Sequence, residues 1–193
     1  MTTSRNSWRN LKKAGLFFLL VLFCGSCSRP LPPDVKVKHN DPNLYLRQDG
    51  WWYNGRPFSG YIQEVQSDQL VTFQMPVMEG RANGKAIGFY ENGHKMLERS
   101  FVNGKLEGEC REWWRNGQCK YSLSYKDNKF EGTQKAFFKN GHLREEANYL
   151  AGNPEGLQRV WNESGQLTSN YTIRNKRLYG VIKVQSCIPG AAH

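Results

Sequence analysis

The chain has 193 residues, of which 38% are hydrophobic and 19 are glycine, so it is long enough for one domain or for one domain plus a tail. It contains 27 basic and 17 acidic side chains and carries a net charge of +10. Four of the basic residues and none of the acidic ones precede residue 27. The remainder of the chain therefore has 23 basic and 17 acidic side chains and a net charge of +6. This mild basicity excludes a strongly basic nucleic-acid-binding domain and favours anionic partners such as lipid headgroups or acidic glycans.

Residues 1–26 are typical of a targeting segment. A basic, polar start leads into an apolar run over Ala14–Phe23, and ten residues suit a signal peptide but fall short of the roughly 20 that span a bilayer. The small residues Gly25 and Ser26 precede Cys27, in a pattern that resembles a bacterial lipobox. It departs from that pattern at Cys24, where Leu or Val is usual. We predict that Cys27 is acylated; an ordinary secreted protein and an uncleaved anchor are the alternatives.

Residues 27–50 are predicted to form the lipidated cysteine and a tether. Four prolines at positions 30, 32, 33 and 42 disfavour regular structure and favour a stiff, extended chain. The segment would hold the following domain away from a membrane.

The rest of the chain, residues 51–187, repeats every 24 residues, with 188–193 left as a tail. Fixed self-similarity of this kind indicates one small unit stacked on copies of itself. Four rows share the period: Gly60, Gly84, Gly108, Gly132, Gly156 and Gly180; Gly93, Gly117, Gly141 and Gly165; Phe89, Trp113, Phe137 and Trp161; and Tyr53, Val77, Phe101, Tyr125, Tyr149 and Ile173.

Each repeat is predicted to be strand, tight turn, strand and looser turn. Asn116-Gly117 is a strong signal for a type I′ hairpin, and the segment from Asn103 to Gly108 would form the looser turn. The predicted fold is all-β: an elongated antiparallel meander of about six hairpin repeats, with one continuous sheet over residues 53–180.

Blocks such as FVNGKLEG with EWWRNGQ, and YKDNKFEG with AFFKNGH, resemble the variant MORN repeat of the YwqK-type antitoxin family. The resemblance covers roughly residues 53–180 and implies an elongated β-sheet, often behind a lipoprotein signal. Three blocks depart from it, where Asp68-Gln69, Asp127-Asn128 and Asn175-Lys176 replace Asn-Gly. The first departure suggests an atypical terminal repeat.

A two-residue loop at Asn116-Gly117 would set the two faces of the sheet. Trp114 would lie opposite Cys119 and Trp113 opposite Lys120. The more apolar face would then carry Cys110, Glu112, Trp114, Cys119, Tyr121 and Leu123, followed in the next repeat by Ala136, Phe138, Leu143 and Ala147. The more polar face would carry Arg111, Trp113, Lys120, Lys135, Phe137 and Arg144.

The aromatic row on the polar face is the candidate binding site. Flat rings beside cations suit sugar rings, extended peptide or anionic headgroups. The alternative is that the rings pack rung on rung beneath lysine and arginine stems. The candidate residues are Phe89, Trp113, Phe137, Trp161, Arg111, Lys135 and Arg159.

No residue pattern points to an enzyme, a cofactor or a metal site. His94 and His142 lie two repeats apart, which is roughly 20 Å at about 4.8 Å per strand and too far to share a metal ion. Cys110 should oppose Leu123, so a disulfide to Cys119 is not expected, and Cys187 is left as a candidate for intermolecular pairing.

These features predict a non-enzymatic, membrane-tethered scaffold of the bacterial cell envelope, with the outer membrane favoured. It would bind a protein, glycan or lipid partner and no nucleic acid, and its oligomeric state is left open. The resemblance supplies the alternative, an antitoxin-like inhibitor that masks a partner protein through its sheet.

Overall fold

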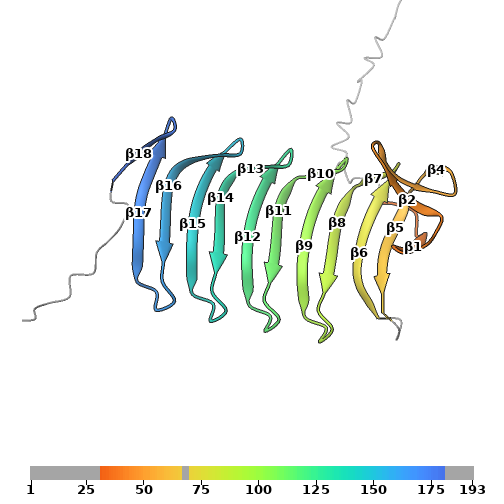
Figure 1. The fold of residues 1–193 in the computed structure, drawn as a ribbon, viewed down its shortest axis with the longest axis horizontal. Coiled ribbons are helices and arrows are strands. Elements are labelled where there is room, and N and C mark those ends of the chain that lie inside the picture. The colour runs from red at the N-terminus through yellow and green to blue at the C-terminus, as the bar shows by residue number, and fades with distance from the viewer. Residues whose placement is uncertain (1–30, 67–69, 181–193) are drawn as a thin grey trace, which may run out of the picture. The chain divides into compact units, whose positions relative to one another are not determined.

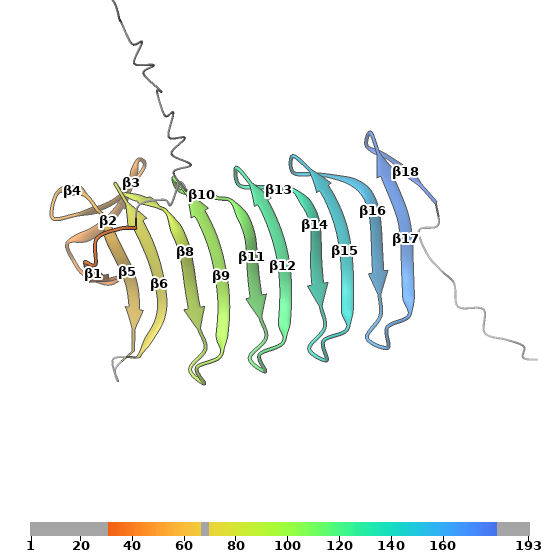
Figure 2. The ribbon, with the colours of Figure 1, turned by 180° about the vertical axis from the view of Figure 1, so that it is seen from behind.

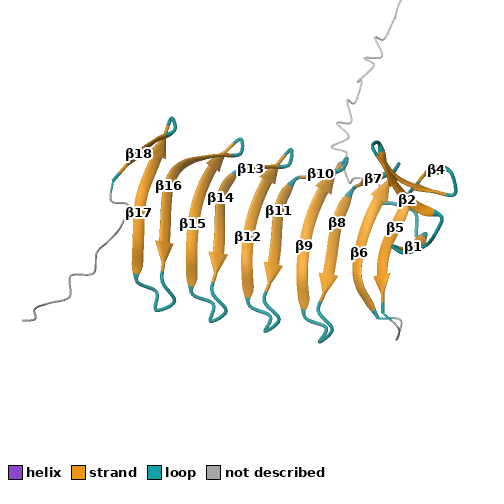
Figure 3. Ribbon diagram, in the orientation of Figure 1, coloured by secondary structure: helices purple, strands orange, loops and turns teal. Residues whose placement is uncertain are grey.

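The computed structural model describes residues 31–66 and 70–180, and these contain strands, turns and no helix (Figures 1 and 3). The strands form one 15-stranded sheet and one three-stranded sheet. Within the described ranges, no helix is long and apolar enough to cross a membrane. The all-β repeat fold predicted from the 24-residue period is therefore confirmed. Cys24, Cys27, Asp68-Gln69, Cys187 and the 188–193 tail lie outside the described residues.

The period reappears as strands of eight residues, here called long, that alternate with strands of six, or in one case nine, residues, side by side in one row (Figures 1 and 2). The long strands are β6 Val71–Met78, β9 Lys95–Val102, β12 Cys119–Lys126, β15 Leu143–Leu150 and β17 Leu167–Arg174. The others are β5 Gly60–Val65, β8 Gly84–Phe89, β11 Gly108–Trp113, β14 Gly132–Phe137 and β16 Asn153–Trp161. Short strands follow four of the long ones: β7 Arg81–Ala82, β10 Lys105–Leu106, β13 Lys129–Phe130 and β18 Arg177–Tyr179. All pairings among these strands are antiparallel, so each repeat adds one rung of two strands.

The two kinds of turn are exchanged relative to the prediction. At the Asn116-Gly117 loop only Gly117 has a positive φ, of 84°, and its N–H donates to Trp114 O at 2.8 Å. This is a three-residue loop with an αL glycine, not a type I′ turn. The type I′ geometry occurs at the other edge, where Asn103 (49°) and Gly104 (81°) both have positive φ. Asp127-Asn128 and Asn175-Lys176 adopt it without glycine.

The glycine row that defines the period lies at bulges rather than in turns. Phe101 pairs with Leu106 on β10, whereas Glu98 pairs with Arg111 on β11, so the register shifts by two residues around Gly108. Gly108 has φ 81° and the equivalent Gly132 has φ 73°. A left-handed backbone is accessible to glycine at little cost, and this explains the unbroken row.

A second irregularity, near the lower loops, changes the predicted faces. Cys110 pairs with Leu123 as predicted, but the register shifts after Glu112, and Trp113 then pairs with Cys119. Lys120 is therefore an extra residue of β12 and, contrary to prediction, does not oppose Trp113. We call the face with Arg111, Lys135 and Arg159 the polar face, and the opposite face, with Cys110, Leu123 and Ala147, the apolar face.

The predicted tether is partly folded. Four strands occur here, β1 Lys36–Lys38, β2 Leu44–Arg47, β3 Gly50–Tyr53 and β4 Arg56–Pro57. β1 pairs in parallel with β5, and β2–β4 form the separate small sheet, so Tyr53 is not part of the repeat sheet and the continuous sheet does not begin at residue 53. Val37 and Leu44 are buried with Phe58, and the apolar contacts they gain outweigh the disorder favoured by the prolines.

Side chains join neighbouring rungs at both edges of the sheet. At the lower edge the amide of Asn116 donates to Lys139 O at 2.9 Å, and the equivalent Asn92 and Asn140 reach Arg115 O and Glu163 O. At the upper edge Glu107 accepts from Asp127 N at 3.0 Å. Glu131 and Glu155 repeat this bond one and two rungs later. These bonds satisfy turn backbone groups and fix the spacing of the rungs.

Candidate functional site

The four rings of the predicted binding row are half-buried on the polar face. Among the described residues no two of these rings are in ring contact, so they do not stack rung on rung. Lys95 Nζ lies 5.2 Å from the centre of the Trp113 ring, and Arg159 Cζ lies 5.4 Å from that of Trp161. Arg159 Nε is buried without a hydrogen-bond partner, as expected for a guanidinium lying along an indole. Lysine and arginine stems therefore cover part of the row.

The cations of the predicted site are already paired with carboxylates. Arg111 lies 2.7 Å from Glu109, Lys135 lies 3.7 Å from Glu146, and Arg159 also bonds Glu146. An incoming anion would have to compete with these partners. Binding by this row stays a prediction, and the ion pairs weaken its case for an anionic ligand.

Glu98 lies on the polar face one rung before Glu109 and Arg111. Its carboxylate accepts hydrogen bonds from Lys85 at 2.7 Å and from Lys95 at 2.9 Å. The hydrogen bond from Lys85, followed by that from Lys95, lowers the pKa of the Glu98 carboxyl. A carboxylate that two cations hold in the charged form is a structural tie rather than a proton-transfer group.

The apolar face carries a second aromatic row that was not predicted to be a site. Phe130 lies between two tyrosines, with ring centres 4.8 Å from Tyr125 and 5.1 Å from Tyr149. The rings of Phe130 and Tyr149 border a hollow of about 160 Å³ whose walls also include Tyr121 and Leu123. Burial raises the pKa of the neighbouring Tyr125 hydroxyl, which keeps this ring neutral. The sequence already indicated this second aromatic row, because Phe101, Tyr125 and Tyr149 recur at the 24-residue period.

The chain itself covers the first rung of the apolar face. Ile62 and Val77 are fully buried there, beneath Leu44 and Phe58 of the N-terminal segment. Val77 is equivalent by the period to Phe101, Tyr125 and Tyr149, which are only half-buried. Figures 1 and 2 show no other described element across the sheet from β8 to β17.

Three cations gather on the apolar face, two of which, Lys120 and Arg144, were predicted to lie on the polar face. Lys120 Nζ lies 4.8 Å from the Trp114 ring centre and 5.1 Å from that of Tyr121. Lys139 Nζ lies 5.5 Å from the Trp114 ring, and Arg144 Cζ lies 5.8 Å from the Tyr121 ring. The prediction that Lys120 and Arg144 lie on the polar face is therefore wrong, because the bulge turns them to the other side.

The remaining reactive side chains have structural roles. Cys110 is buried and free on the apolar face, whereas Cys119 pairs with Trp113 of the polar face, so the prediction that both share a face is wrong. Burial raises the pKa of both thiols. The exposed His94 and His142 bond Arg115 O and Glu163 O, each at 2.9 Å. Across the described residues no group of three or more potential ligands could hold a metal ion.

Comparison with known proteins agrees with the repeat. The family model of the MORN repeat variant matches three consecutive segments, residues 82–103, 106–127 and 130–151. The segments follow one another at the same 24-residue step, and each begins beside a type I′ turn and includes one long strand. No curated protein matches the chain. Residues 82–151 are therefore similar, rung by rung, to the MORN repeat variant.

Proposed function

We propose that the protein is a non-enzymatic scaffold that is anchored in the bacterial cell envelope through Cys27 and binds a partner protein on the apolar face. The observation that carries the proposal is the uneven cover of this face. The N-terminal segment buries Ile62 and Val77 in the first rung, whereas the aromatic side chains of the following rungs have no cover from any described element.

A protein surface suits the remainder of this face. Tyrosine and phenylalanine side chains are enriched at protein interfaces, where each buries a large area at a small cost in conformational entropy. The hollow beside Phe130 and Tyr149 could receive an apolar side chain. A partner placed there would extend the packing that the chain's own N-terminal segment begins.

Site-specific photocrosslinking in cells tests the face. A photoreactive residue at Leu123 points to the apolar face, and one at the adjacent Ser122 points to the polar face of the same strand. We expect one defined crosslinked product from position 123 and none of that size from position 122. Equal crosslinking from both positions would contradict the proposed face.

Metabolic labelling with palmitate tests the anchor. Label should disappear in Cys27→Ser and persist in Cys24→Ser, and membrane fractionation should follow the label. If label survives the change at Cys27, that residue is not the acylated one.

A further inference from the structure

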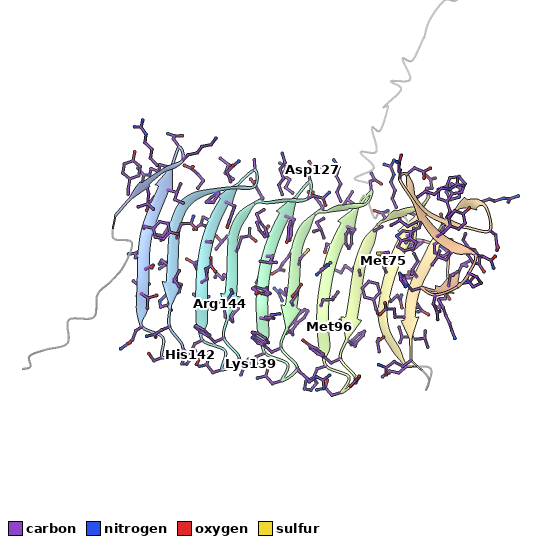
Figure 4. The ribbon with its side chains drawn as sticks, viewed as in Figure 1. Met75, Met96, Asp127, Lys139, His142 and Arg144 are labelled. Carbon is purple, nitrogen blue, oxygen red and sulfur yellow. The ribbon has the colours of Figure 1, made fainter. Side chains whose placement is uncertain are left out.

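Lys120, Lys139 and Arg144 form a cluster of cations around two aromatic rings at the lower end of the apolar face. Lys120 and Lys139 share the Trp114 ring, and Lys120 and Arg144 share the Tyr121 ring, at 4.8–5.8 Å from the ring centres. Figure 4 shows Lys139 and Arg144 at this end of neighbouring strands. Three positive charges from three separate positions of the chain thus converge on one place.

Within the described part of the chain these cations make no ion pair. Of the two carboxylates on this face in the same rungs, Glu112 binds Arg99 at 3.0 Å and Glu145 pairs with none of the three. The cations of the polar face behave differently, because Arg111, Lys135 and Arg159 each have a carboxylate partner.

The fold does not require the cluster. In the preceding rung the residue equivalent to Lys120 is the uncharged Met96, near the lower end of β9 (Figure 4). In the last rung Thr168 is equivalent to Arg144, and Glu163 is equivalent to Lys139. Side chains needed to hold a rung together would recur every 24 residues, as Asn92, Asn116 and Asn140 do. One part of the arrangement recurs, because Arg115 lies 5.6 Å from the centre of the Tyr90 ring as Lys139 does beside Trp114, but Arg115 pairs with Glu91 at 3.5 Å. The group of three cations without a carboxylate partner is restricted to the two central rungs and therefore calls for another explanation.

Like charges held together without a counter-ion repel one another, and a bound anion would remove this cost. A phosphate group offers several charged oxygens, so it can accept from two lysines and an arginine at once, and arginine can bind it through two parallel hydrogen bonds. The Trp114 and Tyr121 rings supply an apolar wall for the group that carries the phosphate.

We propose that Lys120, Lys139 and Arg144, with Trp114 and Tyr121, form a binding site for a phosphate-bearing ligand. This goes beyond the proposed scaffold, because it assigns a ligand chemistry to two rungs and does not depend on acylation of Cys27 or on a partner protein. The phosphate could belong to a lipid headgroup or to a soluble or glycan phosphate, and the experiment distinguishes these sources.

The test compares two triple variants of the full chain, purified in a non-ionic detergent. The first, Lys120→Met, Lys139→Gln and Arg144→Thr, uses at two positions the residues that the neighbouring rungs already contain. The matched control, Lys126→Gln, Lys129→Gln and Lys176→Gln, removes the same charge from exposed positions at the opposite end of the strands. Isothermal titration calorimetry with inorganic pyrophosphate measures binding, and circular dichroism verifies the β-fold of each variant.

We expect the first variant to lose affinity by at least about tenfold, because charge-assisted hydrogen bonds are lost, while the control stays within about twofold of the wild type. Equal losses would show a response to net charge only and would overturn the site, as would wild-type protein that does not bind pyrophosphate. If the triple variant does not fold, the exposed Lys139→Gln alone must still weaken binding.

Phosphatidic acid in the detergent micelles should compete with pyrophosphate if the source is a lipid headgroup and should leave the titration unchanged if it is a soluble or glycan phosphate.

Discussion

Alanine at two glycines of the same row should cost very different amounts of stability. Gly132 has φ 73°, and a Cβ built there meets no atom within 4 Å. Gly132→Ala therefore adds backbone strain only, about 1–2 kcal/mol for an L-residue in the left-handed region. Gly60 has φ 152°, and its Cβ would lie 2.4 Å from Val35 O and 2.7 Å from Phe58 Cζ. Gly60→Ala adds a clash in the packed segment, which typically costs a further 1–3 kcal/mol or so.

Thermal unfolding followed by circular dichroism measures the difference. In a domain of this size each kcal/mol lowers Tm by about 2–4 °C, so we expect a small shift for Gly132→Ala and a shift at least about twice as large for Gly60→Ala. Gly132→Val should exceed Gly132→Ala because β-branched side chains resist positive φ. Gly132→Asn should be the mildest, since asparagine already occupies this region at residues 54, 103, 128 and 175. An unchanged Tm for Gly132→Val, or equal shifts for the two alanine variants, would refute the reasoning.

Three further predictions concern the sheet. Asn116→Asp keeps the oxygen that accepts from Gln118 N but loses the amide that donates to Lys139 O, so Tm should fall. Asn153→Asp makes the same change at an exposed position and serves as a control with little effect on Tm. The pKa of the Glu98 carboxyl is lowered in the folded protein, so the ion pairs of Glu98 stabilise the fold at pH values above its unfolded pKa. This stabilisation is lost as the pH falls through the folded pKa. The Tm of the wild type should therefore drop more than that of Glu98→Gln between about pH 5 and pH 3. Trp113→Ala should lower stability by a few kcal/mol, and if partner binding by the folded variant is unaffected, the aromatic row of the polar face is structural only.

The period predicted the rungs and part of the register, because a repeated unit can bury its side chains only against copies of itself. The pairing of Cys110 with Leu123 followed from the spacing of the turn and was confirmed. The turn types were not predictable in the same way. Both a type I′ turn and a three-residue loop place a glycine at positive φ, so Asn116-Gly117 alone cannot distinguish them. The pairing of the two strands decides between these turn types, because it fixes how many residues remain in the loop.

The candidate site was also harder to predict, because the direction of its side chains depends on how the strands pair. A one-residue insertion reverses the side of every residue beyond it, and the bulge at Lys120 and Arg144 moved both to the apolar face. The proposed phosphate site depends on this reversal. The cations beside the aromatic row suggested a site for anionic headgroups, but only the structure shows that Glu109 and Glu146 pair with those cations.

By itself the sequence determined the fold class, the 24-residue rung and the glycine positions, since these follow from local backbone preference and from repetition. Only the tertiary structure decided which side chains share a face, which charges are paired, and that residues 36–57 fold against the first rung. Those outcomes depend on contacts between strands, where a shift of one residue exchanges the two faces, and local sequence preferences do not encode that shift.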